Sequence, residues 1–215
     1  MNIHFIAIGG AVMHNMAICL SKSNNISGSD DQIYEPSMSR LKKYNLLPEK
    51  LGWDKSKITD KIDCVILGMH AKEDNPELMQ ARKLKITIYS FPEYIAKHSV
   101  DKFKIVIAGS HGKTSITSMI MHVLKSMKIE FDYMVGAKIE GFENMFQLTK
   151  KNKIIILEGD EYLSSTIDPT PKFHKYEPNV AVLTGISWDH INVFKTFDTV
   201  SYTHLRAHET REDLV

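Results

Sequence analysis

Short apolar runs alternate along this chain with stretches in which apolar residues recur at helical spacing. A short, fully apolar run is typical of a strand that is covered on both faces, as in a parallel sheet. Residues 11–22 place Met13, Met16, Ala17 and Leu20 on one helical face. The pattern predicts an α/β protein. We expect strands at residues 3–8, 25–29, 64–67, 87–89, 105–108, 154–157 and 180–183, and helices at residues 11–22, 40–44, 76–85, 92–97 and 115–127.

These elements divide into two α/β units joined near residues 99–102. Residues 1–98 are expected to form a Rossmann-like domain, and residues 103–200 part of a second domain with a mostly parallel sheet. Residues 201–215 are polar and lack the apolar strand pattern that precedes them. They resemble a translated sequencing adapter, so we expect them to be a non-native tail. A genuine charged terminal helix is the alternative.

Composition narrows the class of protein. The 215 residues are 43% hydrophobic and 25% charged, which suits a globular protein with a real core. The net charge of +1 gives no reason to expect a nucleic-acid or membrane surface. The two cysteines, Cys19 and Cys64, lie at apolar positions and are expected to be buried, reduced thiols of a cytoplasmic protein. No second ligand lies at metal spacing near either cysteine, which argues against a zinc site. The sequence does not indicate an oligomeric state.

The richest motif is Gly109-Ser110-His111-Gly112-Lys113-Thr114, followed by Ser115, between a predicted strand and a predicted helix. In such a turn the backbone N–H groups of the loop and of the helix N-terminus point at phosphate oxygens. Lys113 would add positive charge at the β- and γ-phosphates, and the Thr114 hydroxyl would reach Mg²⁺. The loop is shorter than the general P-loop pattern, because Ile107 stands where that pattern has glycine. A glycine turn that only caps a helix is the alternative.

Polar residues with possible catalytic roles follow two more of the predicted strands. Residues 154–157 lead into Glu158-Gly159-Asp160-Glu161, and residues 180–183 lead towards Asp189-His190. The carboxyl ends of parallel strands share one edge of a sheet, and ligands bind there. We therefore expect the glycine loop, an acid and a histidine to converge on one nucleotide–metal site. Taken singly, the acid could be a solvated turn residue and the histidine a structural one.

The first unit also opens with a glycine turn. Gly9 and Gly10 follow the first predicted strand, and Asp30 comes about 20 residues later, in the outline of a dinucleotide-binding fingerprint. The full pattern is not met, because Ala7 and Val12 stand at two of its glycine positions. By spacing alone this is a weak signal for NAD, although a pyrophosphate could rest on the helix N-terminus at Gly10 and Ala11.

Several segments resemble the Mur ligase family. Residues 3–11, 27–30 and 74–78 resemble the N-terminal domain of these enzymes, whereas residues 109–114, Glu158 and Asp189-His190 resemble their central ATPase domain. The resemblance implies a Rossmann-like UDP-sugar domain followed by a P-loop ATPase domain. It implies ATP and Mg²⁺ as cofactors, and UDP-N-acetylmuramate with an amine-bearing peptide or amino acid as substrates.

The resemblance also implies roles for individual residues. Lys113, Glu158 and His190 would be catalytic, and Thr114, Glu158 and His190 would hold metal. The loop 109–115 would bind ATP. Gly9, Gly10, Ala11, Ser29, Asp30 and His70 would bind the UDP-sugar. Glu161 has two possible roles, facing either the metal or the incoming amine.

Within the family, residues 158–162, 172–176 and 188–194 resemble a branch that joins a murein tripeptide to UDP-N-acetylmuramate through an acyl phosphate during peptidoglycan recycling. A branch that joins L-alanine is the alternative, although it usually has Ser-Asp where this chain has Tyr162-Leu163. Family members continue into a third domain, so the chain is expected to be an inactive N-terminal fragment with a truncated ATPase domain. An NAD-dependent oxidoreductase or a non-catalytic nucleotide-binding fragment are the alternatives of another class.

Overall fold

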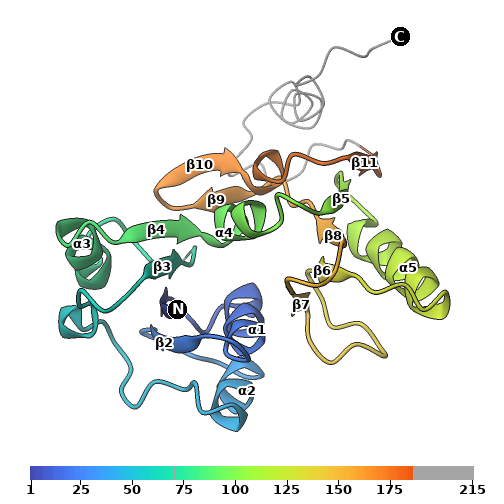
Figure 1. Cartoon of the computed structure of the whole chain (residues 1–215). Helices are drawn as coiled ribbons and strands as arrows, with labels where there is room; N and C mark the ends of the chain where they lie inside the picture. Colours follow the sequence, from blue (N-terminus) through green and yellow to red (C-terminus); the bar gives the residue numbers. More distant parts are fainter. Residues whose placement is uncertain (70, 186–215) are drawn as a thin grey trace. The chain divides into compact units, whose positions relative to one another are not determined.

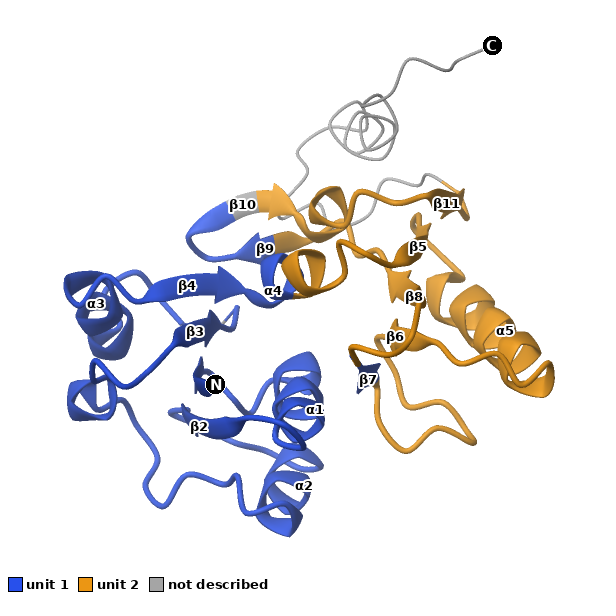
Figure 2. Ribbon diagram, viewed as in Figure 1, with its two compact units in different colours: residues 1–94, 146–148, 164–169 blue, residues 95–145, 149–163, 170–215 orange. Residues whose placement is uncertain are grey.

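The computed structural model describes residues 1–69 and 71–185, which form two compact units (Figures 1 and 2). The first unit consists of Met1–Tyr94 with the short segments Phe146–Leu148 and Ser164–Pro169. The second consists of Ile95–Met145, Thr149–Leu163 and residues 170–185. The predicted residues His70 and His190 and the tail 201–215 lie outside the described residues.

The first unit is built on a parallel sheet in the order β2-β1-β3-β4. Its central strands β1 and β3 are almost completely buried; β3 is entirely apolar, as expected of a strand covered on both faces, and β1 is apolar except for Asn2 and the buried His4. The prediction for the first strand was wrong at its end, because the chain turns at Ala7 (φ 67°) and the N–H groups of Ala7 and Ile8 both donate to the Ser29 carbonyl. The strands are β1 Asn2–Ile6, β2 Asn25–Ser29, β3 Cys64–Leu67 and β4 Thr87–Ser90.

The helices of this part of the chain begin and end close to the predicted positions. The clearest start is that of α3, where Pro76 occupies the first turn and the Asn75 side chain accepts hydrogen bonds from the N–H groups of Glu77 and Leu78. The helices are α1 Ala11–Leu20, α2 Ser37–Lys43, the 3₁₀ turn η1 Lys55–Lys57, α3 Pro76–Lys83 and α4 Phe91–His98.

A polar pair is buried inside the first unit. His4 and Glu77 are both inaccessible to solvent, with His4 Nε2 3.1 Å from Glu77 Oε2. His4 Nδ1 hydrogen-bonds Ser27 Oγ at 2.9 Å, and Glu77 Oε1 accepts from the Asp54 N–H at 2.8 Å. Burial by itself would raise the pKa of Glu77, but the hydrogen bonds from His4 and Asp54 outweigh it and hold this pKa below its usual value. The pair therefore anchors α3 to β1.

The second unit carries the other large sheet, in which β11, β5, β8 and β6 follow one another in that order, whereas the short strand β7 belongs to the segment 146–148 of the first unit. The pairs β11–β5, β5–β8 and β6–β8 are parallel, as predicted for the strands at 105–108, 154–157 and 180–183. The helix α5 Lys113–Ser126 follows β5 and packs against β5 and β8 (Figure 1). The strands are β5 Phe103–Ala108, β6 Asp132–Met134, β7 Phe146–Gln147, β8 Ile154–Glu158 and β11 Val180–Leu183. A separate ribbon, β9 Leu163–Ser165 and β10 Asp168–Pro171, precedes the 3₁₀ turn η2 Lys172–Lys175.

An ion pair is buried beneath this sheet. Lys102 Nζ lies 3.0 Å from Asp132 Oδ2, and the two side chains are only 6% and 0% exposed. Lys102 also donates to the carbonyls of Thr149 and Asn152, while Asp132 accepts from the side chains of both residues. The network ties β6 to the chain entering β5 and β8. Asp132 also explains why β6 was not predicted, since a charged residue interrupts its apolar pattern.

Two further sequence expectations concern cysteines and membranes. Within the described part of the chain, Cys19 and Cys64 are buried and form no disulfide, as predicted. Among the described residues, no helix combines the length and the apolar character that crossing a membrane requires.

We predict that Asp132→Ala will lower the free energy of unfolding by about 3 kcal/mol, because it leaves the Lys102 ammonium buried without its carboxylate. Glu140 is an exposed acid of the same unit, and we expect Glu140→Ala to change stability by less than about 0.5 kcal/mol. Urea unfolding followed by circular dichroism measures both. Equal, small losses for the two variants would show that the buried pair does not stabilise this unit.

Candidate functional site

A glycine loop joins β5 to α5 at the carboxyl edge of the second sheet. Gly109 has φ 109° and Gly112, which precedes the first residue of α5, has φ 78°. Both angles lie where residues with a side chain are strained. A Cβ on Gly109 would also lie 2.7 Å from Thr184 Oγ1, whereas a Cβ on Gly112 would meet nothing within 4 Å. The loop therefore depends on glycine at both positions, and most strongly at Gly109.

The start of α5 has the features of an anion site. No side chain caps α5, so no capping side chain accepts a hydrogen bond from the first N–H groups of the helix, which face the glycine loop. Lys113 is the first helical residue, and its ammonium folds back over the loop to donate to the Gly109 carbonyl at 2.6 Å. A helix N-terminus and a lysine ammonium together attract negatively charged groups such as phosphate.

Lys113 is also paired with an acid. Its Nζ lies 3.0 Å from Glu161 Oε2, and the side chains are 14% and 2% exposed. The sequence allowed two roles for Glu161, facing either the metal or the incoming amine. In the structure its carboxylate is paired with Lys113. No feature of the residue spacing indicates this contact.

Glu158 connects three parts of the second unit. It ends β8, and its Oε1 accepts a hydrogen bond from Thr114 Oγ1 at 2.9 Å. Its Oε2 accepts from the Gly136 N–H at 2.8 Å, on the loop after β6. Thr114 and Glu158, both predicted as metal ligands, therefore come together. Gly136 was missed, because the strand before it was not predicted.

Thr184 closes the loop from the side of β11. Its N–H donates to the Ala108 carbonyl at 2.9 Å, and its hydroxyl hydrogen-bonds the carbonyls of Ala108 and His111. The Ser110 N–H in turn donates to the Gly185 carbonyl at 3.0 Å. Thr184 is the first residue after β11, so the strand-end rule that pointed to Glu158 could have found it.

Asp160, which lies between Glu158 and Glu161 in the sequence, forms an ion pair with a lysine. Lys172 Nζ lies 2.6 Å from Asp160 Oδ2. Burial alone would raise the pKa of Asp160, but the charge and hydrogen bond of Lys172 outweigh it and hold this pKa below its usual value. Nearby, Tyr176 is fully buried, and burial raises the pKa of its hydroxyl far above the ordinary value. The loop after β8 thus presents its acids to different partners.

The donor set suits a hard divalent cation. Thr114 and Glu158 supply a hydroxyl and a carboxylate oxygen, the kind of ligand that Mg²⁺ prefers, and Mg²⁺ usually keeps several waters. Within residues 1–69 and 71–185, no three His, Cys, Asp or Glu side chains gather as a metal cluster. A metal held by the described residues would therefore depend on these two oxygens, on water and on a phosphate.

The turn before α1 is the second predicted site. Gly10 precedes α1, which also lacks a side-chain cap, and Ala11 is exposed. Asp30 Oδ2 accepts from the Gly9 N–H at 2.7 Å, and Ser29 Oγ accepts from Lys57 Nζ at 2.9 Å. Burial raises the pKa of Asp30 and outweighs its backbone hydrogen bonds. Gly9, Gly10, Ala11, Ser29 and Asp30 thus gather around one turn, in which Asp30 holds the backbone.

Comparison with known proteins gives a consistent picture. The family model "Mur ligase middle domain" matches residues 107–213. The UDP-N-acetylmuramate–L-alanine ligase of Clostridium acetobutylicum is 32% identical over 203 residues, which are 94% of this chain and 42% of that protein. The corresponding ligase of Caldicellulosiruptor bescii is 32% identical over 198 residues, with 91% and 41% covered. The chain thus spans about two fifths of the length of these relatives.

Two solved structures share the fold. The UDP-N-acetylmuramate:L-alanyl-γ-D-glutamyl-meso-diaminopimelate ligase from Neisseria meningitides is 25% identical with a TM-score of 0.82, covering 96% of this chain and 68% of that one. The UDP-N-acetylmuramate–alanine ligase from Thermotoga maritima is 24% identical with a TM-score of 0.72, covering 94% and 46%. The α/β fold predicted from the sequence, a Rossmann-like unit followed by a P-loop unit, is confirmed.

We predict that Gly109→Ala will destabilise the chain more than Gly112→Ala. Both substitutions put a Cβ on a backbone with positive φ, at a cost of about 1 kcal/mol. Only the Cβ at 109 would also clash with the backbone of Thr184 and Gly185. Urea unfolding compares the two variants, and an equal loss of stability would contradict the close packing of this loop.

Proposed function

Because this chain belongs to the Mur ligase family, we propose that it is the nucleotide-binding part of an ATP-dependent ligase acting on UDP-N-acetylmuramate. The observation that carries the proposal is the loop 109–114, with its helix N-terminus, Lys113 and the Thr114–Glu158 contact at one edge of the sheet. The family assignment replaces the alternative of an NAD-dependent oxidoreductase.

The reaction we propose has two steps. A carboxylate oxygen of UDP-N-acetylmuramate attacks the γ-phosphorus of ATP, which forms an acyl phosphate and releases ADP. The amine nitrogen of the second substrate then attacks the acyl carbon, and inorganic phosphate leaves as the amide forms. The first step needs mainly positioning and neutralisation of charge on the transferred group. Lys113 and the N–H groups at the start of α5 supply both.

Thr114 and Glu158 are the residues we propose to hold Mg²⁺ with ATP. When bound, Mg²⁺ would neutralise charge on the phosphate oxygens. Glu158 is oriented for this role before any metal arrives, since the Gly136 N–H holds one of its oxygens and the Thr114 hydroxyl the other. His190 remains a proposed ligand from the resemblance alone. The turn formed by Gly9, Gly10 and Ala11, together with Ser29, Asp30 and His70, is the part that we propose binds the UDP-sugar.

For the amine we propose a murein tripeptide. The segments 158–162 and 172–176 resemble that branch of the family, and a solved structure of a tripeptide ligase shares the fold with a TM-score of 0.82. L-alanine is the second candidate, favoured by the 32% identity to L-alanine ligases. A phosphate-release assay on the gene product that contains this chain, with ATP, UDP-N-acetylmuramate and either amine, separates the two candidates.

We predict that Lys113→Ala will weaken the binding of Mg²⁺–ATP to this chain by roughly two orders of magnitude, because it removes the only lysine that the described structure places on the loop. Isothermal titration calorimetry measures the dissociation constant. The exposed Lys125, in the last turn of α5, provides a control, and Lys125→Ala should leave it nearly unchanged. Near-normal ATP binding by Lys113→Ala would refute the nucleotide-site assignment.

We predict that Glu158→Gln will raise the Mg²⁺ concentration needed for half-maximal ATP binding by roughly tenfold, because an amide oxygen is a weaker Mg²⁺ ligand than a carboxylate. The control is Glu140→Gln, which removes one exposed negative charge from the same unit. A titration midpoint that is unchanged in Glu158→Gln would show that this residue only braces the turn.

A further inference from the structure

In the Lys113–Glu161 ion pair, the carboxylate contacts the Lys113 ammonium, which is the group that a bound phosphate would contact. Glu161 Oε2 lies 3.0 Å from Lys113 Nζ, and the carboxylate side chain is almost fully buried. An ammonium has three N–H donors, and here one goes to the Gly109 carbonyl at 2.6 Å and another to Glu161. The carboxylate therefore neutralises the charge of Lys113 and takes up one of its N–H donors, as a bound phosphate oxygen would.

The loop that carries Glu161 is anchored independently of this pair. Asp160 holds it through Lys172 Nζ at 2.6 Å and through the Tyr162 N–H, which donates to Asp160 Oδ1 at 3.1 Å. The Lys172 N–H donates to the Tyr162 carbonyl at 3.0 Å. Loss of the Lys113 contact would therefore leave the backbone of Glu161 in place. A side chain held in this way can change partner without unfolding its loop.

The neighbouring acid has a different task. Glu158 is committed to Thr114 and to the Gly136 N–H, at 2.9 and 2.8 Å. Glu161 contacts the lysine and Glu158 contacts the hydroxyl, so the two acids do not serve one ligand. A phosphate that reached Lys113 with Glu161 still in contact would bring two negative charges together in a buried place, which is strongly unfavourable.

We propose that Glu161 is an internal anion that holds Lys113 and is exchanged for a β- or γ-phosphate oxygen when a nucleotide binds. This inference rests on the proposed nucleotide site and adds a role for Glu161 as a competitor of the bound phosphate that sets the affinity for the nucleotide. Only a nucleotide whose phosphates reach Lys113 compensates for the broken ion pair. Glu161 thereby lowers the affinity of the site for di- and triphosphates, whose phosphates must displace it, and leaves the affinity for monophosphates unaffected.

The test is calorimetric binding of ATP, ADP and AMP, each with Mg²⁺, to the 215-residue chain. In Glu161→Gln the competing charge is gone, so we expect ATP to bind more tightly by on the order of tenfold. AMP has no phosphate that reaches Lys113, so its affinity should not change. Glu161→Asp keeps the charge on a shorter side chain and should tighten ATP binding by a smaller factor.

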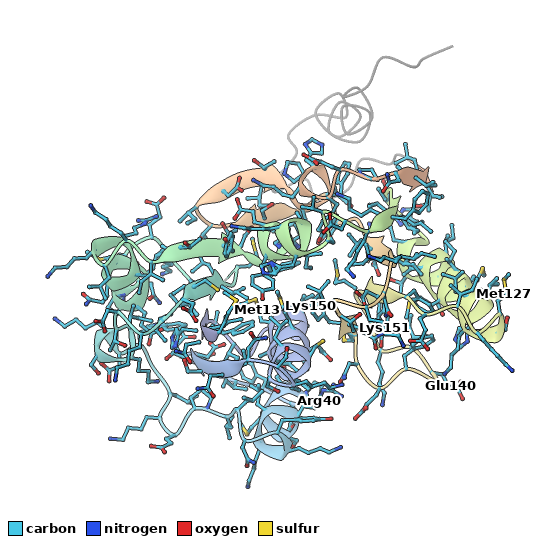
Figure 3. All side chains as sticks on the ribbon, in the orientation of Figure 1. Met13, Arg40, Met127, Glu140, Lys150 and Lys151 are labelled. Carbon is cyan, nitrogen blue, oxygen red and sulfur yellow. The ribbon has the colours of Figure 1, made fainter. Side chains whose placement is uncertain are left out.

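Glu140→Gln is the matched control for the loss of one negative charge. Glu140 lies beside Gly141, whose carbonyl accepts from Lys125 Nζ in the last turn of α5 (Figure 3). Lys125 follows Lys113 by twelve positions, which places this turn about 18 Å along the helix from the loop. We expect Glu140→Gln to leave the affinities for all three nucleotides unchanged.

The effect must also depend on Lys113. In a double-mutant cycle, Glu161→Gln should tighten ATP binding less in a Lys113→Ala background than in the wild type. Unchanged or weaker ATP binding in Glu161→Gln, with a normal melting temperature, would overturn the exchange, as would equal tightening of ATP and AMP. A wild-type chain that binds no ATP would refute the proposed nucleotide site itself, a result distinct from the other two.

Discussion

The parallel register between β5 and β8 determines where the charged groups of the candidate site lie. Ile107 pairs with Glu158, and the Gly159 N–H donates to the Ile107 carbonyl at 2.8 Å, one step beyond the strand. The loop 109–112 and the acids after β8 therefore leave the sheet side by side. A slip of one residue would turn Glu158 to the other face of the sheet and separate it from Thr114.

The acids that follow β8 can lie so close together because each one has a separate partner. Glu158 accepts from Thr114 and Gly136, Asp160 pairs with Lys172, and Glu161 pairs with Lys113. Without these partners, three neighbouring carboxylates in a partly buried loop would repel one another. The lowered pKa of Asp160 shows that its partner outweighs the cost of burial. The same arrangement orients Lys113 and Thr114 before any ligand is present.

Much of this site could be predicted because it follows from strand ends. The apolar runs 105–108, 154–157 and 180–183 became adjacent parallel strands, so Thr114 and Glu158 met as expected. The rest depends on contacts that spacing does not encode. Strand β6 was missed because Asp132, buried against Lys102, breaks its apolar pattern, and Gly136 was missed with it. The partner of Glu161 depends on how side chains reach across two loops, which residue order alone does not specify.

Each unit of this chain has a glycine turn between a strand and a helix with acids nearby, but the acids have different partners in the two turns. In the first unit, the Asp30 carboxylate shapes the turn before α1, because it accepts a hydrogen bond from the Gly9 N–H. Burial raises the pKa of this carboxyl group. In the second unit, Thr184 shapes the turn instead, through the carbonyls of Ala108 and His111. Near this turn, Glu158 accepts from Thr114 Oγ1 and from the Gly136 N–H, and Glu161 pairs with the ammonium of Lys113. An acid whose partner is a side chain can exchange that partner for a ligand, and in our proposal this difference separates the structural carboxylate of Asp30 from that of Glu161.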